Sequence, residues 1–194
     1  WLKTVSAPNV TIIRQSAFAR CLNLTSASFP KLETIDNSAF WTCESMASFD
    51  FSNVTSIGSE AFQACEKLNN VSLPKITELK RAVFAGCKSL ESISLPIANI
   101  IDAEALYACH ALEKMELGCT SEINFKPDNT YLETKKIDLV LEGVEASNAV
   151  GKIWKDVSWK SITSKNSNIK SPVFGVAYFG CTKAYVENNE EKRL

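Results

Sequence analysis

Cysteine is the residue type in this sequence with the richest chemistry, and most of its copies recur at one fixed interval. Five of the seven lie 22 residues apart in succession: Cys21, Cys43, Cys65, Cys87 and Cys109. Thiols can form disulfides or bind zinc, but side chains that point in parallel suit a disulfide poorly. No Cys-x-x-Cys pair is present for a metal. We interpret these five thiols as small apolar fillers of a narrow core, buried and reduced.

The other residues with reactive side chains give little support for catalysis. Cys119 and Cys181 lie outside the regular series and could pair with each other in an oxidising compartment. His110 is the single histidine; it has no carboxylate partner at a motif-like spacing, and we expect it in a surface turn. The sequence contains no nucleophile elbow, phosphate-binding loop or Rossmann glycine pattern. We therefore predict a protein that is not an enzyme and that uses no cofactor or metal.

The composition is that of a folded globular chain of one to one and a half ordinary domains. Of 194 residues, 45% are hydrophobic and 22% are charged, which is too apolar for a disordered chain. The net charge of -1 provides no general field for nucleic acid or anionic lipid, and no apolar run approaches a membrane span. Because the sequence opens at Trp1, we expect a processed product or a fragment, and the missing signal peptide does not locate the parent protein.

The residues around each cysteine keep the same phase as the cysteine itself. Apolar residues follow three positions later: Leu24, Met46, Leu68, Leu90 and Leu112. Another set follows eight positions later: Phe29, Phe51, Leu73, Leu95 and Leu117. An Ala-Phe pair or a close variant precedes each cysteine: Ala17-Phe18, Ala39-Phe40, Ala61-Phe62, Val83-Phe84 and Ala105-Leu106. The chain is therefore built from internal repeats of 22 residues.

Each repeat contains two hydrophobic periodicities in succession. Alternating apolar residues after the cysteine predict a short strand with one buried face, which the prolines Pro30, Pro74 and Pro96 end in three of the repeats. From Ile35 to Cys43 the apolar positions fall at i, i+4, i+5 and i+8, which favours a helix of about two turns. A 22-residue unit cannot bury its own apolar edge, so the repeats must stack into a solenoid.

These repeats resemble the BspA-like class of leucine-rich repeats, which occurs in surface proteins of bacteria and some parasitic protists. The resemblance rests on Leu68-x-x-Val71-x-Leu73-Pro74 and on the later Ala-Phe-x-x-Cys box, and it covers about residues 1–123. The general leucine-rich consensus has Asn or Cys after the strand; here Leu32, Val54 and Ile76 stand there, as in the BspA-like subclass. The resemblance implies a parallel sheet on a concave face, with short helices or turns on the convex face.

The repeat pattern fades towards the C-terminus, so we predict two regions. Residues 1–123 form the leucine-rich repeats, and residues 124–194 form a cap that covers the open end of the solenoid. Within the cap, Ile137, Leu139 and Leu141 predict a strand, and 146–154 predicts a short helix. The apolar segment 172–181 could form a further strand or hairpin arm, and residues 186–194 are expected to fray.

The residues between the buried strand positions should face outwards on the concave side, and most of them are small and polar. The candidate binding residues are Ser26, Ser28, Ser48, Asp50, Asn70, Ser72, Ser92, Ser94, Lys114 and Glu116, with Thr4 and Ser6 continuing the two rows. Such hydroxyls could meet a close-fitting partner, or they could simply keep a crowded sheet soluble. Trp41 and Tyr107 could form a contact patch on the convex side, although edge packing is the stronger interpretation. The phenylalanines of the Ala-Phe pairs are assigned to the core.

The functional prediction is a protein-binding module, because solenoids present extended surfaces that they normally use for binding. The family resemblance, rather than composition, suggests a location on the cell surface or in the extracellular space and adhesion to host or matrix proteins. The alternatives are a structural spacer in a larger surface protein and an accessory domain of an enzyme. The identity of the ligand and the oligomeric state do not follow from the sequence.

Overall fold

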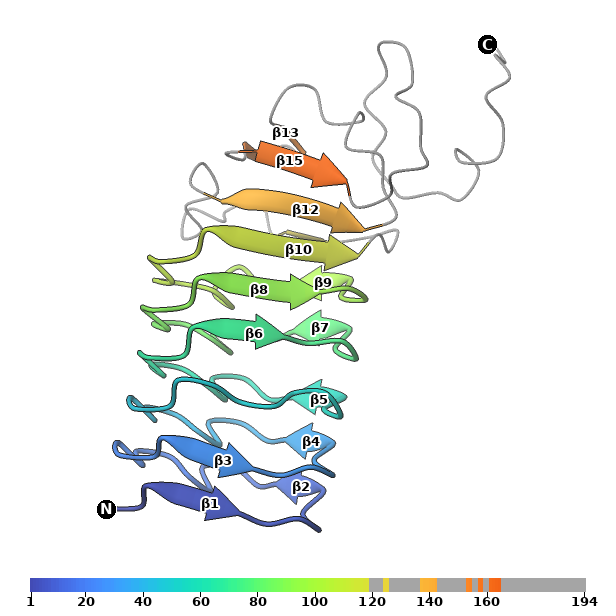
Figure 1. The fold of residues 1–194 in the computed structure, drawn as a ribbon. Coiled ribbons are helices and arrows are strands. Elements are labelled where there is room, and N and C mark those ends of the chain that lie inside the picture. The colour runs from blue at the N-terminus through green and yellow to red at the C-terminus, as the bar shows by residue number, and fades with distance from the viewer. Residues whose placement is uncertain (119–123, 126–136, 143–152, 155–156, 159–160, 165–194) are drawn as a thin grey trace, which may run out of the picture.

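The computed structural model shows a column of stacked coils, each of which is one 22-residue turn of a solenoid (Figure 1). The structure describes residues 1–118, 124–125, 137–142, 153–154, 157–158 and 161–164. In most coils the chain runs through one strand on the front of the column, turns, passes through a second short strand and returns through a series of turns. The predicted solenoid of 22-residue repeats is confirmed.

The front strands are short. They are β1 (Thr4–Ser6), β3 (Ser26–Ser28), β6 (Asn70–Ser72), β8 (Ser92–Leu95), β10 (Lys114–Gly118), β12 (Asp138–Glu142) and β15 (Ser161–Ser164). They pair in parallel in the orders β1-β3 and β15-β12-β10-β8-β6. Ser92 lies opposite Asn70 and Lys114 opposite Ser92, so the register between these coils equals the repeat length.

The front sheet continues beyond the last regular repeat, with a different register. Asp138 lies opposite Lys114, an offset of 24 residues, and Ser161 lies opposite Asp138, an offset of 23 residues. The strand predicted from Ile137, Leu139 and Leu141 is therefore present as β12. The predicted helix over 146–154 falls largely outside the described residues, and so do 172–181 and 186–194. The division of the chain at residue 123 stays a prediction.

A second set of parallel strands, which the sequence analysis did not predict, runs down the column beside the first. These strands are β2 (Ile12–Ile13), β4 (Thr34–Ile35), β5 (Ser56–Ile57), β7 (Glu78–Leu79), β9 (Ile100–Ile101) and β11 (Asn124–Phe125). They pair in the orders β2-β4-β5 and β11-β9-β7. A separate antiparallel pair joins β13 (Ile153–Trp154) to β14 (Val157–Ser158). Ile35, which we assigned to the start of a helix, is the buried end of β4, and its equivalent Ile57 is the buried end of β5.

The helix predicted from Ile35 to Cys43 is wrong, and the alternative of turns on the convex side is confirmed. The described residues contain no helix. Alternate amides instead bond within and between coils: Trp41 N–H donates to the carbonyl of Ser38 at 3.1 Å, whereas Phe40 N–H donates to Ala61 of the next coil at 2.8 Å. The apolar residues have the spacing of a helix, but carbonyl groups of the neighbouring coil accept the amide hydrogen bonds that carbonyl groups of the same segment would accept in a helix.

Residues with a positive φ make this turn geometry possible. Ser38 and Thr42 have φ angles of 55° and 58°. Each is the third residue of a four-residue turn closed by a backbone hydrogen bond between its first and fourth residues. Type II turns require a positive φ at this third position. The equivalents of Thr42 are Arg20, Ala64, Gly86 and Ala108. A left-handed conformation costs an L-residue roughly 1–2 kcal/mol, so only Gly86 adopts it at little cost.

Stacked phenylalanines and cysteines fill the centre of the column. The rings of Phe18 and Phe40 stack with centroids 5.2 Å apart, and those of Phe40 and Phe62 stack at 5.1 Å. Phe84 continues the stack at 5.6 Å. Phe40, Phe62 and Phe84 are fully buried, as predicted, and truncating such a ring to Ala typically costs 3–5 kcal/mol.

The cysteines are held by a bond that recurs from coil to coil. The Sγ of Cys43 donates to the carbonyl of Phe18 at 3.1 Å, and the thiols of Cys65, Cys87 and Cys109 each donate to the phenylalanine 25 residues earlier at 3.2–3.3 Å. All five thiols of the series are free. Four are buried, and Cys21 is half-buried because a coil covers it on one side only.

Burial raises the pKa of these thiols. Desolvation is the main cause, and it raises the pKa of Cys43 and Cys109 to about 12 and shifts Cys65 and Cys87 in the same direction. The buried thiols therefore stay protonated and are poor nucleophiles and metal ligands.

No helix among the described residues is long and apolar enough to cross a membrane.

We predict that the protein loses stability as the pH rises above about 8.5. The unfolded thiols ionise near that pH, whereas the folded thiols keep their protons until the pH approaches the raised values. Each buried thiol therefore lowers the free energy of unfolding by about 1.4 kcal/mol per pH unit in that window. Urea unfolding between pH 8 and 10 should show a smaller slope for Cys65→Ala. Leu68→Ala, which removes a buried group that does not titrate, should lower stability but keep the slope. Equal slopes for all three proteins would contradict the prediction.

Ala64→Gly should stabilise the fold, against the usual effect of glycine. Ala64 has a φ of 59°, so glycine relieves roughly 1–2 kcal/mol of backbone strain. Its greater freedom in the unfolded chain costs about 0.5–1 kcal/mol. Thermal unfolding should show a net gain of up to about 1 kcal/mol. The matched Ala61→Gly, at a buried position without a positive φ, should destabilise by about 1 kcal/mol or more. A loss of stability in Ala64→Gly would refute this reading of the turns.

Candidate functional site

The predicted concave face consists of the outward-facing residues of the front strands and of the coil between β3 and β6. Two rows run along the column. The first is Thr4, Ser26, Ser48, Asn70, Ser92 and Lys114, and the second is Ser6, Ser28, Asp50, Ser72, Ser94 and Glu116. Ser92, Ser94 and Glu116 are half-buried, and the others are exposed. Every candidate binding residue is therefore exposed or half-buried on one face of the column.

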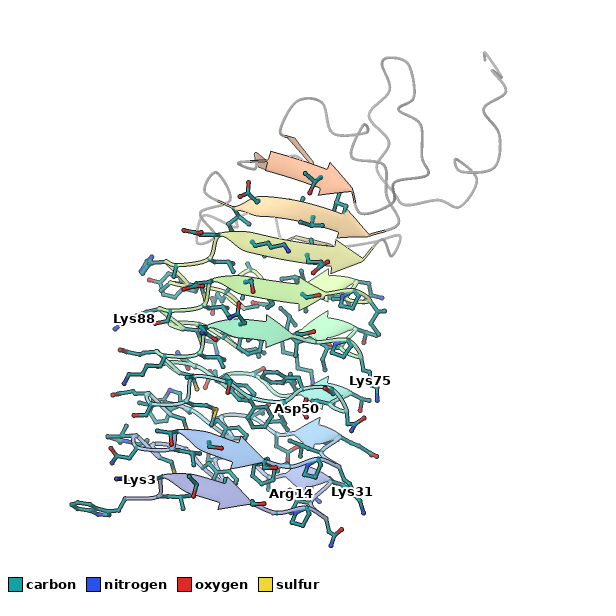
Figure 2. All side chains as sticks on the ribbon, viewed as in Figure 1. Lys3, Arg14, Lys31, Asp50, Lys75 and Lys88 are labelled. Carbon is teal, nitrogen blue, oxygen red and sulfur yellow. The ribbon has the colours of Figure 1, made fainter. Side chains whose placement is uncertain are left out.

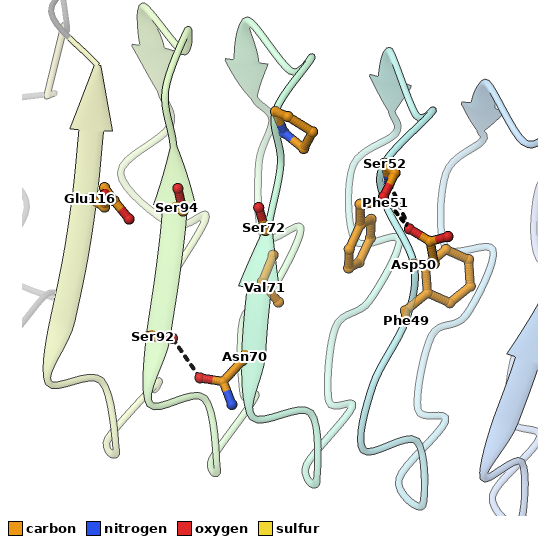
Figure 3. A pocket seen from close by; sticks show the side chains of 11 residues that line it. Phe49, Asp50, Phe51, Ser52, Asn70, Val71, Ser72, Ser92, Ser94 and Glu116 are labelled. Atoms are coloured by element: carbon orange, nitrogen blue, oxygen red, sulfur yellow. Dashed lines mark hydrogen bonds between the residues drawn. The ribbon is translucent and has the colours of Figure 1, made fainter. Parts of the chain in front are cut away.

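Three local hydrogen bonds organise the middle of this face, between two pairs of residues (Figure 3). The hydroxyl of Ser92 donates to Oδ1 of Asn70 at 2.5 Å. Oδ1 of Asp50 accepts the hydroxyl of Ser52 at 2.6 Å and its backbone N–H at 2.9 Å. These bonds to the ionised form hold the pKa of Asp50 below its usual range, the hydroxyl bond having the larger effect. Asp50 is therefore negatively charged at neutral pH.

The front sheet is interrupted between β3 and β6. Residues 47–51 occupy the place of a strand but pair with neither neighbour. Asn69 N–H donates to the carbonyl of Ala47 at 3.3 Å, and in the intact coils bonds such as Leu73 N–H to Ser94 O at 2.9 Å continue the ladder. For Ser48, Phe49 and Asp50 the described structure has no backbone–backbone bond. At residues 48–50 the main chain of this coil therefore makes no backbone bond to the strand on either side.

We attribute the interruption to the ring of Phe49. The equivalent positions hold Ala27, Val71, Ile93 and Met115, and the centre of a coil has little room for a ring among the stacked phenylalanines. The ring of Phe49 lies with its centroid 5.1 Å from those of both Phe40 and Phe62, edge-on to each. Phe29 occupies the position of Phe51 in the coil of β3, and that strand still pairs with β1.

The interruption adjoins a hollow of about 430 Å³ on the concave face (Figure 3). Its lining comprises Phe49, Asp50, Phe51, Ser52, Asn70, Val71, Ser72, Pro74, Ser92, Ser94 and Glu116. Six of the predicted residues thus come together around one depression: Asp50, Asn70, Ser72, Ser92, Ser94 and Glu116. The remaining four, Ser26, Ser28, Ser48 and Lys114, lie on the same rows but do not line it.

Sequence reasoning missed the apolar floor of the hollow. Phe49, Phe51, Val71 and Pro74 were assigned to the core or to the end of a strand, and Ser52 was not singled out. The signal was present, because Phe49 is the single ring at its position in the repeat. The effect of Phe49 on the sheet depends on how its ring packs against those of Phe40 and Phe62 in the neighbouring coils.

Where the structure describes them, the other candidate residues form no second site. Trp41 packs under the guanidinium of Arg20, whose Cζ lies 5.9 Å from the ring centroid. Tyr107 occupies the equivalent position three coils away, so the two exposed rings do not form one patch.

His110 is exposed in a turn, as predicted. Cys119 and Cys181 lie outside the described residues. Among the residues that the structure places, no three His, Cys, Asp or Glu side chains are grouped to hold a metal.

Ion pairs on the rest of the surface join coils rather than build a site. Arg81 contacts Glu60 of the preceding coil and Glu104 of the following coil, each at 3.0 Å. Lys88 contacts Glu66 at 2.6 Å. All of these groups are substantially exposed, so each pair contributes about 0–1 kcal/mol. Their role is to align neighbouring coils.

Comparison with known proteins identifies the repeat. A family model described as a BspA type leucine-rich repeat region matches residues 2–135 in six copies. A crystal structure of a leucine rich cell surface protein from Faecalibacterium prausnitzii A2-165 is similar, with a TM-score of 0.57 and 18% identity over 84% of this chain and 57% of that one. At this identity the likeness shows the fold alone.

A crystal structure of a leucine-rich repeat protein from Bacteroides ovatus matches with a TM-score of 0.48 and 23% identity, over 85% of this chain and 52% of that one. The present chain thus spans a little more than half of either protein. No curated protein matched the sequence.

We predict that Phe49→Val restores a continuous front sheet. In the wild-type protein the amide protons of Phe49 and Asp50 should exchange with solvent at least about tenfold faster than those of Ile93 and Ser94, because they make no ladder bonds. Phe49→Val should slow their exchange to the rate of the intact strands. Native-state hydrogen exchange measured by NMR checks this.

The matched control is Phe51→Leu, which introduces the residue found at Leu73 and leaves Phe49 in place. Its amides at positions 49 and 50 should still exchange quickly. Slow exchange in the wild-type protein, or no change in Phe49→Val, would show that the interruption does not depend on this ring.

Proposed function

The chain belongs to the BspA-type leucine-rich repeat proteins, and from this premise we propose that it is a non-enzymatic module that binds a protein partner on its concave face. One observation carries the choice of face. The front sheet exposes two rows of small polar side chains around a hollow, and none of the described segments covers them. Small hydroxyl side chains lose little entropy when a partner orders them, and they can donate or accept.

The chemistry of the rest of the column supports binding rather than catalysis. The buried thiols are protonated and bonded to carbonyls, and the single histidine is exposed in a turn. Solenoids use extended surfaces for recognition, because successive repeats add contact area without changing the register of the rows. The hollow interrupts this regular surface and is the place where a partner side chain could be buried most deeply.

We further propose a location on the cell surface or in the extracellular space, with adhesion to a host or matrix protein. Support comes from the name of a structural neighbour, the leucine rich cell surface protein of Faecalibacterium prausnitzii. This support is by analogy of fold, and fold does not fix function. A structural spacer remains the competing function, because bonds between all neighbouring coils would also suit a stiff stalk.

The test is a screen of the immobilised protein against an array of extracellular-matrix and host surface proteins, followed by variants. Ser28→Trp and Ser72→Trp place a bulky group on the concave face and should reduce capture of a bound protein at least about tenfold. Ser89→Trp makes the same change at an exposed position in the turn after Cys87, and should leave capture unchanged. Circular dichroism and thermal unfolding confirm that each variant folds.

Full capture by Ser28→Trp and Ser72→Trp would reject the concave face as the binding surface. An array on which no protein is captured would favour the spacer function instead.

A further inference from the structure

We propose that the hollow on the concave face binds an arginine or lysine side chain from an extended segment of the protein partner, with the Asp50 carboxylate facing the cationic head. This inference rests on the proposed function, because it specifies the chemistry of the partner at the same surface. It concerns one side chain in one depression, whereas the proposed function concerns the whole face. The two can therefore fail separately.

The charge of the hollow selects a cation. Its lining contains two carboxyl groups, Asp50 and Glu116, and no basic group. Figure 2 shows Lys31 and Lys75 at one edge of the column and Lys88 at the other, with Asp50 on the face between them. Lys75 bonds to Asn53 Oδ1 at 2.9 Å and Lys88 to Glu66, so these amines are held away from the hollow. Lys114 of β10 lies on the same face but does not line the hollow, so a partner's cation would meet a carboxylate with no amine in the lining.

The composition of the lining suits a long side chain with an apolar stem. Phe49, Phe51, Val71 and Pro74 contribute apolar surface to the lining, and the carboxyl, amide and hydroxyl groups provide its polar part. Arginine and lysine bury their methylene stems against apolar surface while the charged head stays near polar groups. Arginine is also enriched in the central, desolvated parts of protein interfaces.

The main chain at the interruption offers hydrogen-bonding groups to the same segment. Ser48, Phe49 and Asp50 have amides and carbonyls that the front ladder does not use. Exposed Ser72 and half-buried Ser94 add hydroxyls on the neighbouring strands. Peptides in extended conformation bind such surfaces through backbone bonds, with pockets that accept alternate side chains. An extended segment that carries one basic residue therefore satisfies the charge, the apolar floor and the free backbone groups together.

Other occupants fit less well. An acidic segment would place a carboxylate beside Asp50, and like charges in an interface are unfavourable. A sugar ring usually stacks on the exposed face of an aromatic residue, but Phe51 is buried and Phe49 is packed edge-on to Phe40 and Phe62. A basic protein segment is the occupant that the chemistry of the lining favours.

The experiment uses a phage-displayed library of random twelve-residue peptides, selected on the intact wild-type chain. Selected peptides should be enriched in arginine or lysine at one position, and their dissociation constants can be measured by fluorescence polarisation. Asp50→Lys should weaken binding at least about tenfold, and replacing the peptide's basic residue by Gln should have a similar effect. Binding should also weaken between 50 and 300 mM NaCl because the pair is partly exposed.

Glu44→Lys is the matched control, because it makes the same change of charge at an exposed turn residue away from the hollow. It should leave binding within about twofold of the wild-type value. The sharpest support is a charge exchange, in which peptides with Glu at the selected position bind Asp50→Lys better than they bind the wild-type protein.

The outcomes separate this inference from the proposed function. If Ser72→Trp blocks the peptides but Asp50→Lys does not, the concave face binds ligands and the cation site is wrong. If Ser28→Trp and Ser72→Trp both bind the peptides normally, the concave face itself is wrong. Selected peptides without a basic residue, or a library that yields no binding peptide, would also overturn the cation site.

Discussion

In the regular repeats, backbone hydrogen bonds between residues 21–23 positions apart hold each coil against its neighbours, and each coil forms part of the wall of the next one's core. A unit this short has no interior of its own, so a side chain such as Phe62 is buried only because the rings of Phe40 and Phe84 lie above and below it. The same constraint explains the turns on the convex side. Their alternate amides donate to the next coil, and the chain accepts positive φ angles to keep that register.

The cysteines illustrate how the constraint sets chemistry. A thiol is small enough for the narrow end of the coil, and its proton finds a carbonyl in the preceding coil, as Cys65 does at Phe40. Burial then keeps the proton on the sulfur. A residue type that commonly signals redox or metal chemistry thus serves packing here, because its neighbours leave room for no ligand and favour the neutral form.

The concave face shows how one departure from the repeat can create a local site. Rows of serines on intact strands give a smooth surface, whereas a depression lies beside Asp50 where the coil that contains Phe49 forms no front strand. Each coil of a regular solenoid is stabilised by the same contacts with its neighbours. Where the strand pairing of one coil is lost, other contacts must therefore replace the stability that the pairing would have provided. Here the compensation is the cluster of rings around Phe49, which buries apolar surface in place of strand pairing.

The sequence by itself determined the period, the solenoid, the family resemblance, the inward-facing residues and the two outward rows, because each follows from the phase of residues along the chain. The structure decided what depends on contacts between coils. Ile35 to Cys43 has the spacing of a helix but folds as turns, since the next coil offers acceptors to its amides. The side strands and the hollow beside Phe49 likewise arise between repeats, where the linear pattern of a single repeat carries no information about the space available.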